Sequence, residues 1–80
     1  MHTQQETTVT LTRDGRVFIN EEVVDRKHFP LKLFQIVKTR PDKTVIFKAD
    51  AHQSIENLVE LIDMARGVGV EKFLIGTKPK

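Results

Sequence analysis

Few side chains in this sequence combine a reactive type with the spacing that chemistry requires. His52 lies four residues ahead of Glu56, and a His–Glu pair can hold a metal ion, but one pair supplies at best half of a site. Asp50 follows a strand-like run and precedes a helix-like one, and carboxylates at strand ends are common in active sites. A structural role suits Asp50 better, because its side chain can accept backbone N–H bonds in the loop. We therefore predict no catalytic residue, no metal site and no cofactor site.

The motifs that commonly carry enzyme chemistry are also missing from the sequence. There is no Cys, which excludes disulfides and thiolate metal sites. The glycines form neither a P-loop nor a dinucleotide-binding fingerprint, and Ser54, the sole serine, is suited to capping a helix. Phe29 and Phe34 fall on a predicted helix and Phe47 and Phe73 in apolar runs, which favours core packing over base stacking. The chain is predicted to act by binding and not by catalysis.

Length and composition indicate one small domain. A chain of 80 residues with 39% apolar and 30% charged residues fits a globular fold, and so small a core is marginal without a second copy to pack against. The net charge of +2 comes from charges of alternating sign, which argues against a nucleic-acid partner. No run of about 18 apolar residues is present to span a membrane, and no signal peptide opens the chain. Residues 1–7 are polar and without period, and we expect them to be a flexible linker or the artificial end of a domain cut from a longer protein.

Turn and capping residues divide the remainder into alternating elements. Asp14-Gly15 is a strong hairpin signal, because glycine accepts the positive φ of such turns. Pro30 is tolerated only in the first turn of a helix. Ser54 suits the start of a second helix, and Gly69 suits the left-handed cap that ends it. The expected elements are strands at Thr8–Arg13, Arg16–Ile19 and Val23–Val24, a helix from His28 or Phe29 to Arg40, a strand at Thr44–Lys48, a helix after Ser54, and a strand at Phe73–Ile75.

Apolar spacing then predicts how these elements pack. Thr44–Lys48 is apolar on both faces and is expected in the middle of the sheet. Its crossover to Phe73–Ile75 should be parallel and right-handed. The predicted fold is α+β, with two helices on one face of a mixed five-stranded sheet, in the order β-β-β-α-β-α-β. The predicted inward face of the first helix holds Leu33, Phe34 and Val37; that of the second holds Ile55, Leu58, Val59, Ile62 and Ala65, centred on Leu58, Val59 and Ile62.

An ordered set of segments resembles the periplasmic domain of the ExbD/TolR family. The set begins with Asp14–Asn20, a strand with an Asp-Gly turn before it and an Asn turn after it. It continues with the strand Thr44–Asp50, the helix segment Leu58–Asp63 and the segment Val68–Phe73. Each piece is weak alone, and their order and spacing carry the resemblance, which covers residues 8–77. A basic tail, residues 78–80, follows.

The resemblance implies a role in energy transduction at the inner membrane. Members of this family are single-pass inner-membrane proteins whose periplasmic domains form homodimers. With a membrane partner of the ExbB/TolQ type they use proton flow and pass the energy to a TonB- or TolA-like protein. A TolR-like member would instead contact peptidoglycan. The implied location of this chain is the periplasm, and its implied partners do not include nucleic acid.

Two positions match the family pattern and two features depart from it. The matching positions are Asp50 and Gly69, to which the resemblance assigns structural roles. Where the family often has a tyrosine entering the second helix, this chain reads Ser54-Ile55, which puts any contact of that tyrosine in doubt. The membrane helix with its proton-carrying acid is not in this sequence, so these residues alone are not expected to move protons.

Partner binding is predicted at Phe73, Leu74 and Ile75. We expect this short apolar strand at an edge of the sheet, pairing with a second copy or with an extended partner segment, in preference to an interior position. The alternative function is that of a small RNA- or ligand-binding α+β domain, which a basic stripe on an open sheet face would support. A metal-dependent enzyme ranks third, since it needs a further carboxylate or His near His52.

Overall fold

The computed structural model describes residues 7–40 and 44–78, with side chains described as far as Gly76. Its element order confirms the predicted β-β-β-α-β-α-β arrangement. The elements are β1 (Thr7–Leu11), β2 (Val17–Ile19), β3 (Glu22–Val24), α1 (Phe29–Val37), β4 (Thr44–Asp50), α2 (Ile55–Gly67) and β5 (Lys72–Lys78). No helix among these described residues is long and apolar enough to cross a membrane.

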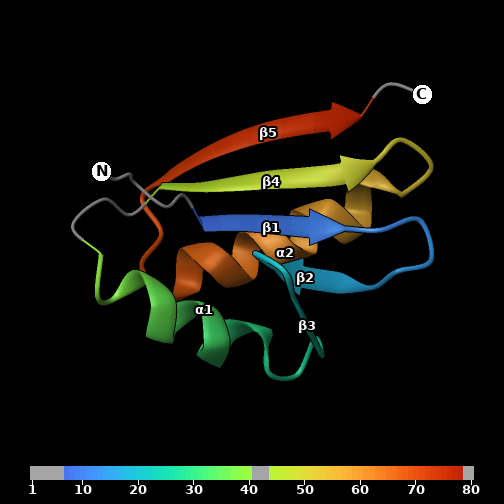
Figure 1. Cartoon of the computed structure of the whole chain (residues 1–80). Helices are drawn as coiled ribbons and strands as arrows, with labels where there is room; N and C mark the ends of the chain where they lie inside the picture. The colour runs from blue at the N-terminus through green and yellow to red at the C-terminus, as the bar shows by residue number, and fades with distance from the viewer. Residues whose placement is uncertain (1–6, 41–43, 79–80) are drawn as a thin grey trace, which may run out of the picture.

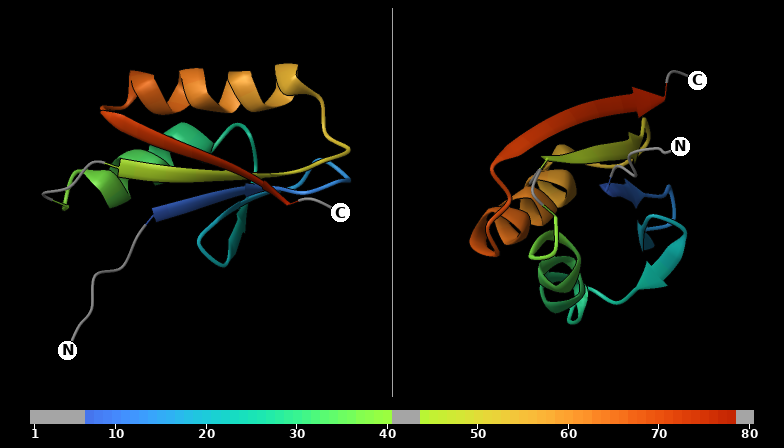
Figure 2. Two further views of the ribbon diagram at one scale, coloured as in Figure 1. Left: turned by 90° about the horizontal axis from the view of Figure 1, so that it is seen from above. Right: turned by 60° about the vertical axis from the view of Figure 1, so that its left-hand side comes forward.

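The five strands form one mixed sheet in the spatial order β3-β2-β1-β4-β5, as Figure 1 shows. β1 pairs with β2 and β2 with β3 in antiparallel fashion, whereas β4 runs parallel to both of its neighbours, β1 and β5. Both helices cover the same face of this sheet, which leaves the opposite face open (Figure 2). The predicted α+β fold is therefore confirmed, with β4 inside the sheet and β5 at one edge.

The β1–β2 hairpin is closed by the predicted turn. The Gly15 N–H donates to the Thr12 carbonyl at 3.0 Å, and the Thr12 N–H donates to the Arg16 carbonyl at 2.9 Å. Gly15 has a φ of 89°, a conformation that costs an L side chain energy but costs glycine little. The loop is thus a three-residue turn that ends in a left-handed glycine, a common way to join two twisted strands.

The core lies between the helices and the covered face of the sheet. Each fully buried aliphatic or aromatic side chain there contributes about 1.5–3 kcal/mol relative to exposure. Alternate residues of the strands point into this layer, which gives the sheet its one-sided burial. The buried apolar residues are Val9, Leu11, Val17, Ile19, Phe29, Leu33, Val37, Val45, Phe47, Ala49, Leu58, Leu61, Ala65 and Val70.

The buried face of α2 differs from the predicted one. Leu58 is buried as expected, but its buried neighbours on the helix are Leu61 and Ala65. Val59 is 46% exposed and Ile55 is 70% exposed, so their assignment to the inward face is wrong. The reason is that α2 packs against α1 on one flank as well as against the sheet, and this second contact turns Leu61 inward.

The buried face of α1 is likewise narrower than predicted. Phe29, Leu33 and Val37 are buried at a four-residue spacing, whereas Phe34 is 43% exposed. Phe34 follows Leu33 directly, so it lies about 100° further around the helix. The prediction of Phe34 as an inward residue is therefore wrong, and its ring instead lies 5.6 Å from the Lys38 ammonium group.

The ends of three strands differ from the predicted ends. β1 begins at Thr7, one residue inside the segment expected to be a linker, and ends at Leu11, two residues before the predicted end at Arg13; Thr7 is buried. β4 extends to Asp50 and β5 to Lys78, and these two residues are opposite each other in the ladder. Backbone hydrogen bonds continue along the pair after the apolar side chains end, which a pattern of side-chain types does not report.

Candidate functional site

The predicted binding strand, β5, lies at the edge of the sheet beside β4. Its register places Phe73 opposite Val45 and Ile75 opposite Phe47, on the face that the helices cover. Leu74 is opposite Ile46, on the open face. In the described part of the chain no strand pairs with the outer side of β5. Half of its backbone N–H and C=O groups therefore point outward, because these groups alternate in direction along a strand.

The three predicted contact residues leave this edge apolar on both faces. The Phe73 ring packs on Phe47, with the ring centroids 5.8 Å apart and the planes tilted by 48°. Leu74 and Ile75 are each 57% exposed, on opposite faces of the strand. A strand that paired with β5 would therefore meet apolar side chains both above and below the sheet.

A stripe on α2 adds apolar surface next to this edge. Ile55, Val59 and Ile62 follow each other at intervals of four and three residues, so they lie along one flank of the helix, here called the α2 stripe. The opposite flank of α2 faces α1. On that flank, Glu60 forms an ion pair with Arg26, which lies just before the start of α1. Figure 2 shows that the flank of α2 away from α1 lies toward the β4–β5 side of the sheet, and we assign the α2 stripe to that flank because it is opposite Glu60 on the helix. Sequence reasoning counted all three residues as core; Ile62 is half-buried against the core as predicted, whereas Ile55 and Val59 are exposed.

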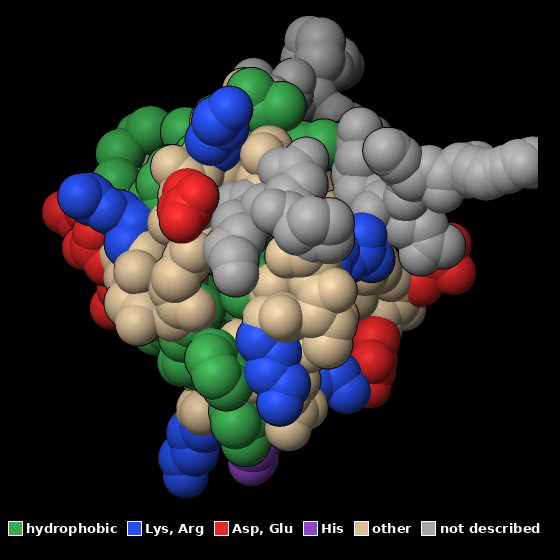
Figure 3. All heavy atoms as spheres, turned by 90° about the vertical axis from the view of Figure 1, so that its left-hand side faces the viewer, with side chains coloured by type: hydrophobic (Ala, Val, Ile, Leu, Met, Phe, Trp, Pro, Cys, Tyr) green, Lys and Arg blue, Asp and Glu red, His purple; other side chains and the backbone are tan. Residues whose placement is uncertain are grey.

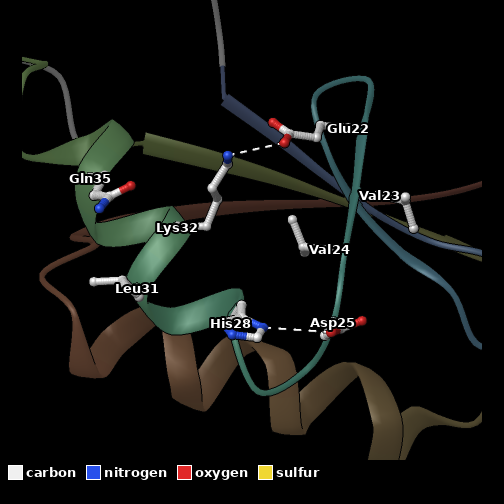
Figure 4. A pocket seen from close by; sticks show the side chains of 8 residues that line it. All are labelled: Glu22, Val23, Val24, Asp25, His28, Leu31, Lys32 and Gln35. Atoms are coloured by element: carbon white, nitrogen blue, oxygen red, sulfur yellow. Dashed lines mark hydrogen bonds and ion pairs between the residues drawn. The ribbon is translucent and has the colours of Figure 1, made fainter.

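The other edge of the sheet, at β3, is built differently. β3 has only three residues, and a hollow of about 360 Å³ separates it from α1 (Figure 4). One ion pair crosses this hollow, with the Lys32 ammonium 3.0 Å from the Glu22 carboxylate; in the connecting loop, His28 Nδ1 lies 3.5 Å from the Asp25 carboxylate. Short, charged edge strands resist pairing with another chain, so β5 is the better candidate for association.

Asp50 and His52 form a local turn before α2. The Asp50 carboxylate accepts the His52 backbone N–H at 2.8 Å, and His52 Nδ1 lies 3.1 Å from the same oxygen. The hydrogen bond from the His52 backbone, then that from its ring, lowers the pKa of the Asp50 carboxyl below its ordinary value. Glu56, the suggested second ligand, is exposed at the start of α2. Among the described residues, no group of three or more His, Cys, Asp or Glu is placed to hold a metal ion.

Gly69 ends α2 in the expected left-handed conformation. Its φ is 108°, its N–H donates to the Arg66 carbonyl, and the next N–H, that of Val70, donates to the Ala65 carbonyl. These two bonds make a Schellman motif with Gly69 at the position that favours glycine. The motif fixes the direction in which the chain leaves α2 to enter β5, so Gly69 influences the candidate site through the backbone.

Charges are mixed on the end of the molecule at which the parallel strands begin. Figure 3 shows the end of the molecule at which the parallel strands begin, and on its visible, described part basic and acidic side chains lie among apolar ones. Surface fields of one sign steer nucleic acids, whereas interspersed charges largely cancel. This face offers no support for an RNA-binding surface.

Comparison with known proteins identifies a family. The family described as "Biopolymer transport protein ExbD/TolR" matches residues 1–80. The chain is also similar to "Biopolymer transport protein exbD2" of Vibrio cholerae serotype O1 (strain ATCC 39315 / El Tor Inaba N16961), with 24% identity over 70 residues. That alignment covers 88% of this chain and 52% of the relative, so the chain spans about half the length of the curated protein that it matches.

Proposed function

Because this chain belongs to the ExbD/TolR family, we propose that it is the periplasmic dimerisation and partner-binding domain of a proton-motive-force-driven complex of the Ton or Tol type. The complex would support transport or the integrity of the envelope. In this proposal the chain performs no catalysis and needs no cofactor. The family match supports the proposal, and one observation about the structure supports its mechanism: among the described residues, no strand pairs with the outer edge of β5, and exposed apolar side chains flank it.

The proposed mechanism is the addition of a strand to β5. The added strand would take up the outward backbone groups of β5, which gives binding energy with little dependence on sequence. Its alternate side chains would pack on Ile75 and the α2 stripe on one face and on Leu74 on the other. A strand that is apolar on both faces fits this site, and β5 of a second copy has that pattern. Exchange of that copy for an extended segment of a TonB- or TolA-like protein would then couple the dimer to its partner.

The contacts with an ExbB/TolQ-like subunit are proposed to lie outside residues 1–80. The relative from Vibrio cholerae is about twice as long as the matched region, which leaves room for a membrane anchor elsewhere in a full-length protein. The proton-carrying step of the complex would then belong to that part, and the domain described here would transmit the resulting movement. If the chain is a TolR-like member, this same domain would contact peptidoglycan.

Two proline variants test pairing at β5 directly. In an edge strand, successive N–H groups point alternately to the neighbouring strand and to solvent. Of Leu74→Pro and Ile75→Pro, one must therefore remove an N–H that points to β4 and the other an N–H that points to solvent. We expect one variant to lose a ladder bond and unfold, and the other to stay folded and lose dimerisation. Circular dichroism reports folding, and sedimentation reports the oligomeric state. A folded proline variant that dimerises as the parent does would overturn the proposal.

A charge in the α2 stripe gives an independent test with a matched control. Val59→Lys places an ammonium group where the added strand would pack, and this should raise the dimer dissociation constant at least about tenfold. Val23→Lys introduces the same group at the β3 edge, where the valine is 56% exposed. Both variants should fold, and only Val59→Lys should weaken association. Equal effects of the two variants would show that the α2 stripe has no special role.

A further inference from the structure

A second hollow, unrelated to the β5 edge, lies where β1 and β4 end. These strands are parallel neighbours, and their chains separate at this point. β1 continues into the hairpin with β2 within the sheet, whereas β4 leads to α2 on the covered face. In doubly wound α/β sheets, ligands bind in the crevice outside the carboxyl ends of strands whose connections diverge; the connections of β1 and β4 also diverge, although β1 leaves by a hairpin and not by a helix. The hollow here measures about 340 Å³.

The side chains around this hollow carry an excess of positive charge. Lys48 is exposed and lies next to Thr10 across the β1–β4 ladder, and Arg13 is in the hairpin that follows β1. Within the described part of the chain, neither the Arg13 guanidinium nor the Lys48 ammonium forms an ion pair. The one carboxylate in the lining, that of Asp50, is engaged by the backbone N–H and the ring of His52. Arg13 also attracts the Asp50 carboxylate electrostatically, so the lining holds two cations against one carboxylate and keeps an excess of one positive charge, to which the Thr10 hydroxyl adds a donor.

The backbone around the hollow is held in place by a side-chain clamp. Nε2 of Gln53 donates to the Thr12 carbonyl at 2.9 Å and to the Arg13 carbonyl at 3.2 Å. Thr12 in turn accepts the Arg16 N–H through Oγ1 at 3.0 Å, which fixes the hairpin. The loops after β1 and β4 are thus tied to each other, so the backbone of the site is ordered in advance, and binding has to order only the exposed side chains of Arg13 and Lys48.

We propose that this hollow binds a small oxyanion, a carboxylate or a phosphate group, between the Arg13 guanidinium and the Lys48 ammonium, with the Thr10 hydroxyl as a further donor. Guanidinium and ammonium groups form their strongest hydrogen bonds with these two anions. The site is open to solvent and therefore weak and sensitive to salt, as a surface electrostatic contact is. The proposal does not depend on association at β5.

Amide-resolved NMR titration of the 80-residue chain tests it. The probes are sodium phosphate, N-acetylglycine as a carboxylate, and N-acetylglycinamide as the neutral control. We expect saturable shift changes at residues 10–13 and 48–50 with phosphate, with N-acetylglycine or with both, and none with the amide. Binding of one anion alone identifies the source of the oxyanion, and binding of both shows that the charge is the shared determinant. Raising the sodium chloride concentration should weaken the binding of either anion.

Matched variants locate the contact. Lys48→Gln and Arg13→Gln should each weaken binding about fivefold or more, while the amide spectrum elsewhere stays that of the parent. Arg16→Gln removes a cation from the same hairpin that already pairs with Asp14 and does not line the hollow, so it should change affinity less than about twofold. Equal losses in all three variants, shift changes centred elsewhere, or the same changes with the neutral amide would overturn the proposal. The titration of the parent chain gives this answer even if a variant fails to fold.

Discussion

Replacing Leu61 by alanine tests the inward face that the structure assigns to α2. Leu61 is fully buried between the sheet and α1, so its truncation removes apolar contacts and leaves a cavity. Leucine-to-alanine changes at such sites cost about 2–5 kcal/mol. A domain of 80 residues has a free energy of unfolding of only about 4–12 kcal/mol at the usual ~0.05–0.15 kcal/mol per residue. The melting temperature should therefore fall by about 10 °C or more, since each kcal/mol lowers it by about 4–8 °C in domains of this size.

The matched control is Val59→Ala, two positions earlier on the same helix. Val59 is 46% exposed, and alanine has the higher helix propensity, so this change should alter the free energy of unfolding by less than about 0.5 kcal/mol. Urea unfolding followed by circular dichroism measures both variants. The measurement belongs at a protein concentration at which sedimentation shows a monomer, because dimerisation would add to the apparent stability. A larger loss for Val59→Ala than for Leu61→Ala would refute the assigned face.

Three further predictions follow from the turns and the polar loop. Gly69→Ala should destabilise the domain by about 1–2 kcal/mol, because Gly69 has a positive φ. Gly67→Ala, inside the last turn of α2, should stabilise the domain by up to about 1 kcal/mol. If urea unfolding gave changes of the same sign for both variants, Gly69 would not be the residue that caps α2. The hydrogen bonds from His52 lower the pKa of Asp50 in the folded state, so the contribution of Asp50 to stability is present above the ordinary carboxyl pKa and is lost as the pH falls through the lowered pKa. Asp50→Asn should remove this part of the acid dependence of unfolding. An unchanged acid dependence in the variant would refute the stabilising role of Asp50. Calorimetric titration with zinc at neutral pH should show no stoichiometric binding, and tight binding would refute the absence of a metal site.

Local chemistry made the order of elements predictable from the sequence. The Asp14-Gly15 turn, the Ser54 cap and the Gly69 terminator each act within a few residues, and the structure has all three: Ser54 Oγ accepts the Asn57 N–H, and both glycines have positive φ. Alternation in the strands was equally informative, because burial on one face of a sheet repeats every second residue. These features depend on neighbours in the chain and not on the final packing.

Contacts between distant elements set the features that the sequence did not predict. On α2 two apolar rows lie side by side, and only the position of α1 determines that Leu61, and not Val59, points inward. The outward position of Phe34 on α1 has the same kind of cause. The hollow at Arg13 and Lys48 depends on the pairing of β1 with β4, which joins segments about 40 residues apart. The residue types at both positions are ordinary for exposed turns and strands, so no local signal marked them.

The difference between the two sheet edges gives the strongest argument for association at β5. Of the exposed large apolar residues among the described side chains, Leu74 and Ile75 lie on β5 and Ile55 and Val59 on α2, whereas Val23 lies on β3 and Leu31 and Phe34 on α1. β3 is short, and the Glu22–Lys32 ion pair joins it to α1, which makes that edge less suited to pairing with another strand. β5 is seven residues long and has apolar side chains on both faces. β5 has lysines at both of its ends, but its centre, Phe73 to Ile75, is apolar, and such an exposed centre would be an aggregation hazard in a domain that stayed monomeric. Its presence here is therefore better explained as a surface that a second strand covers, which is the basis of the proposed dimer.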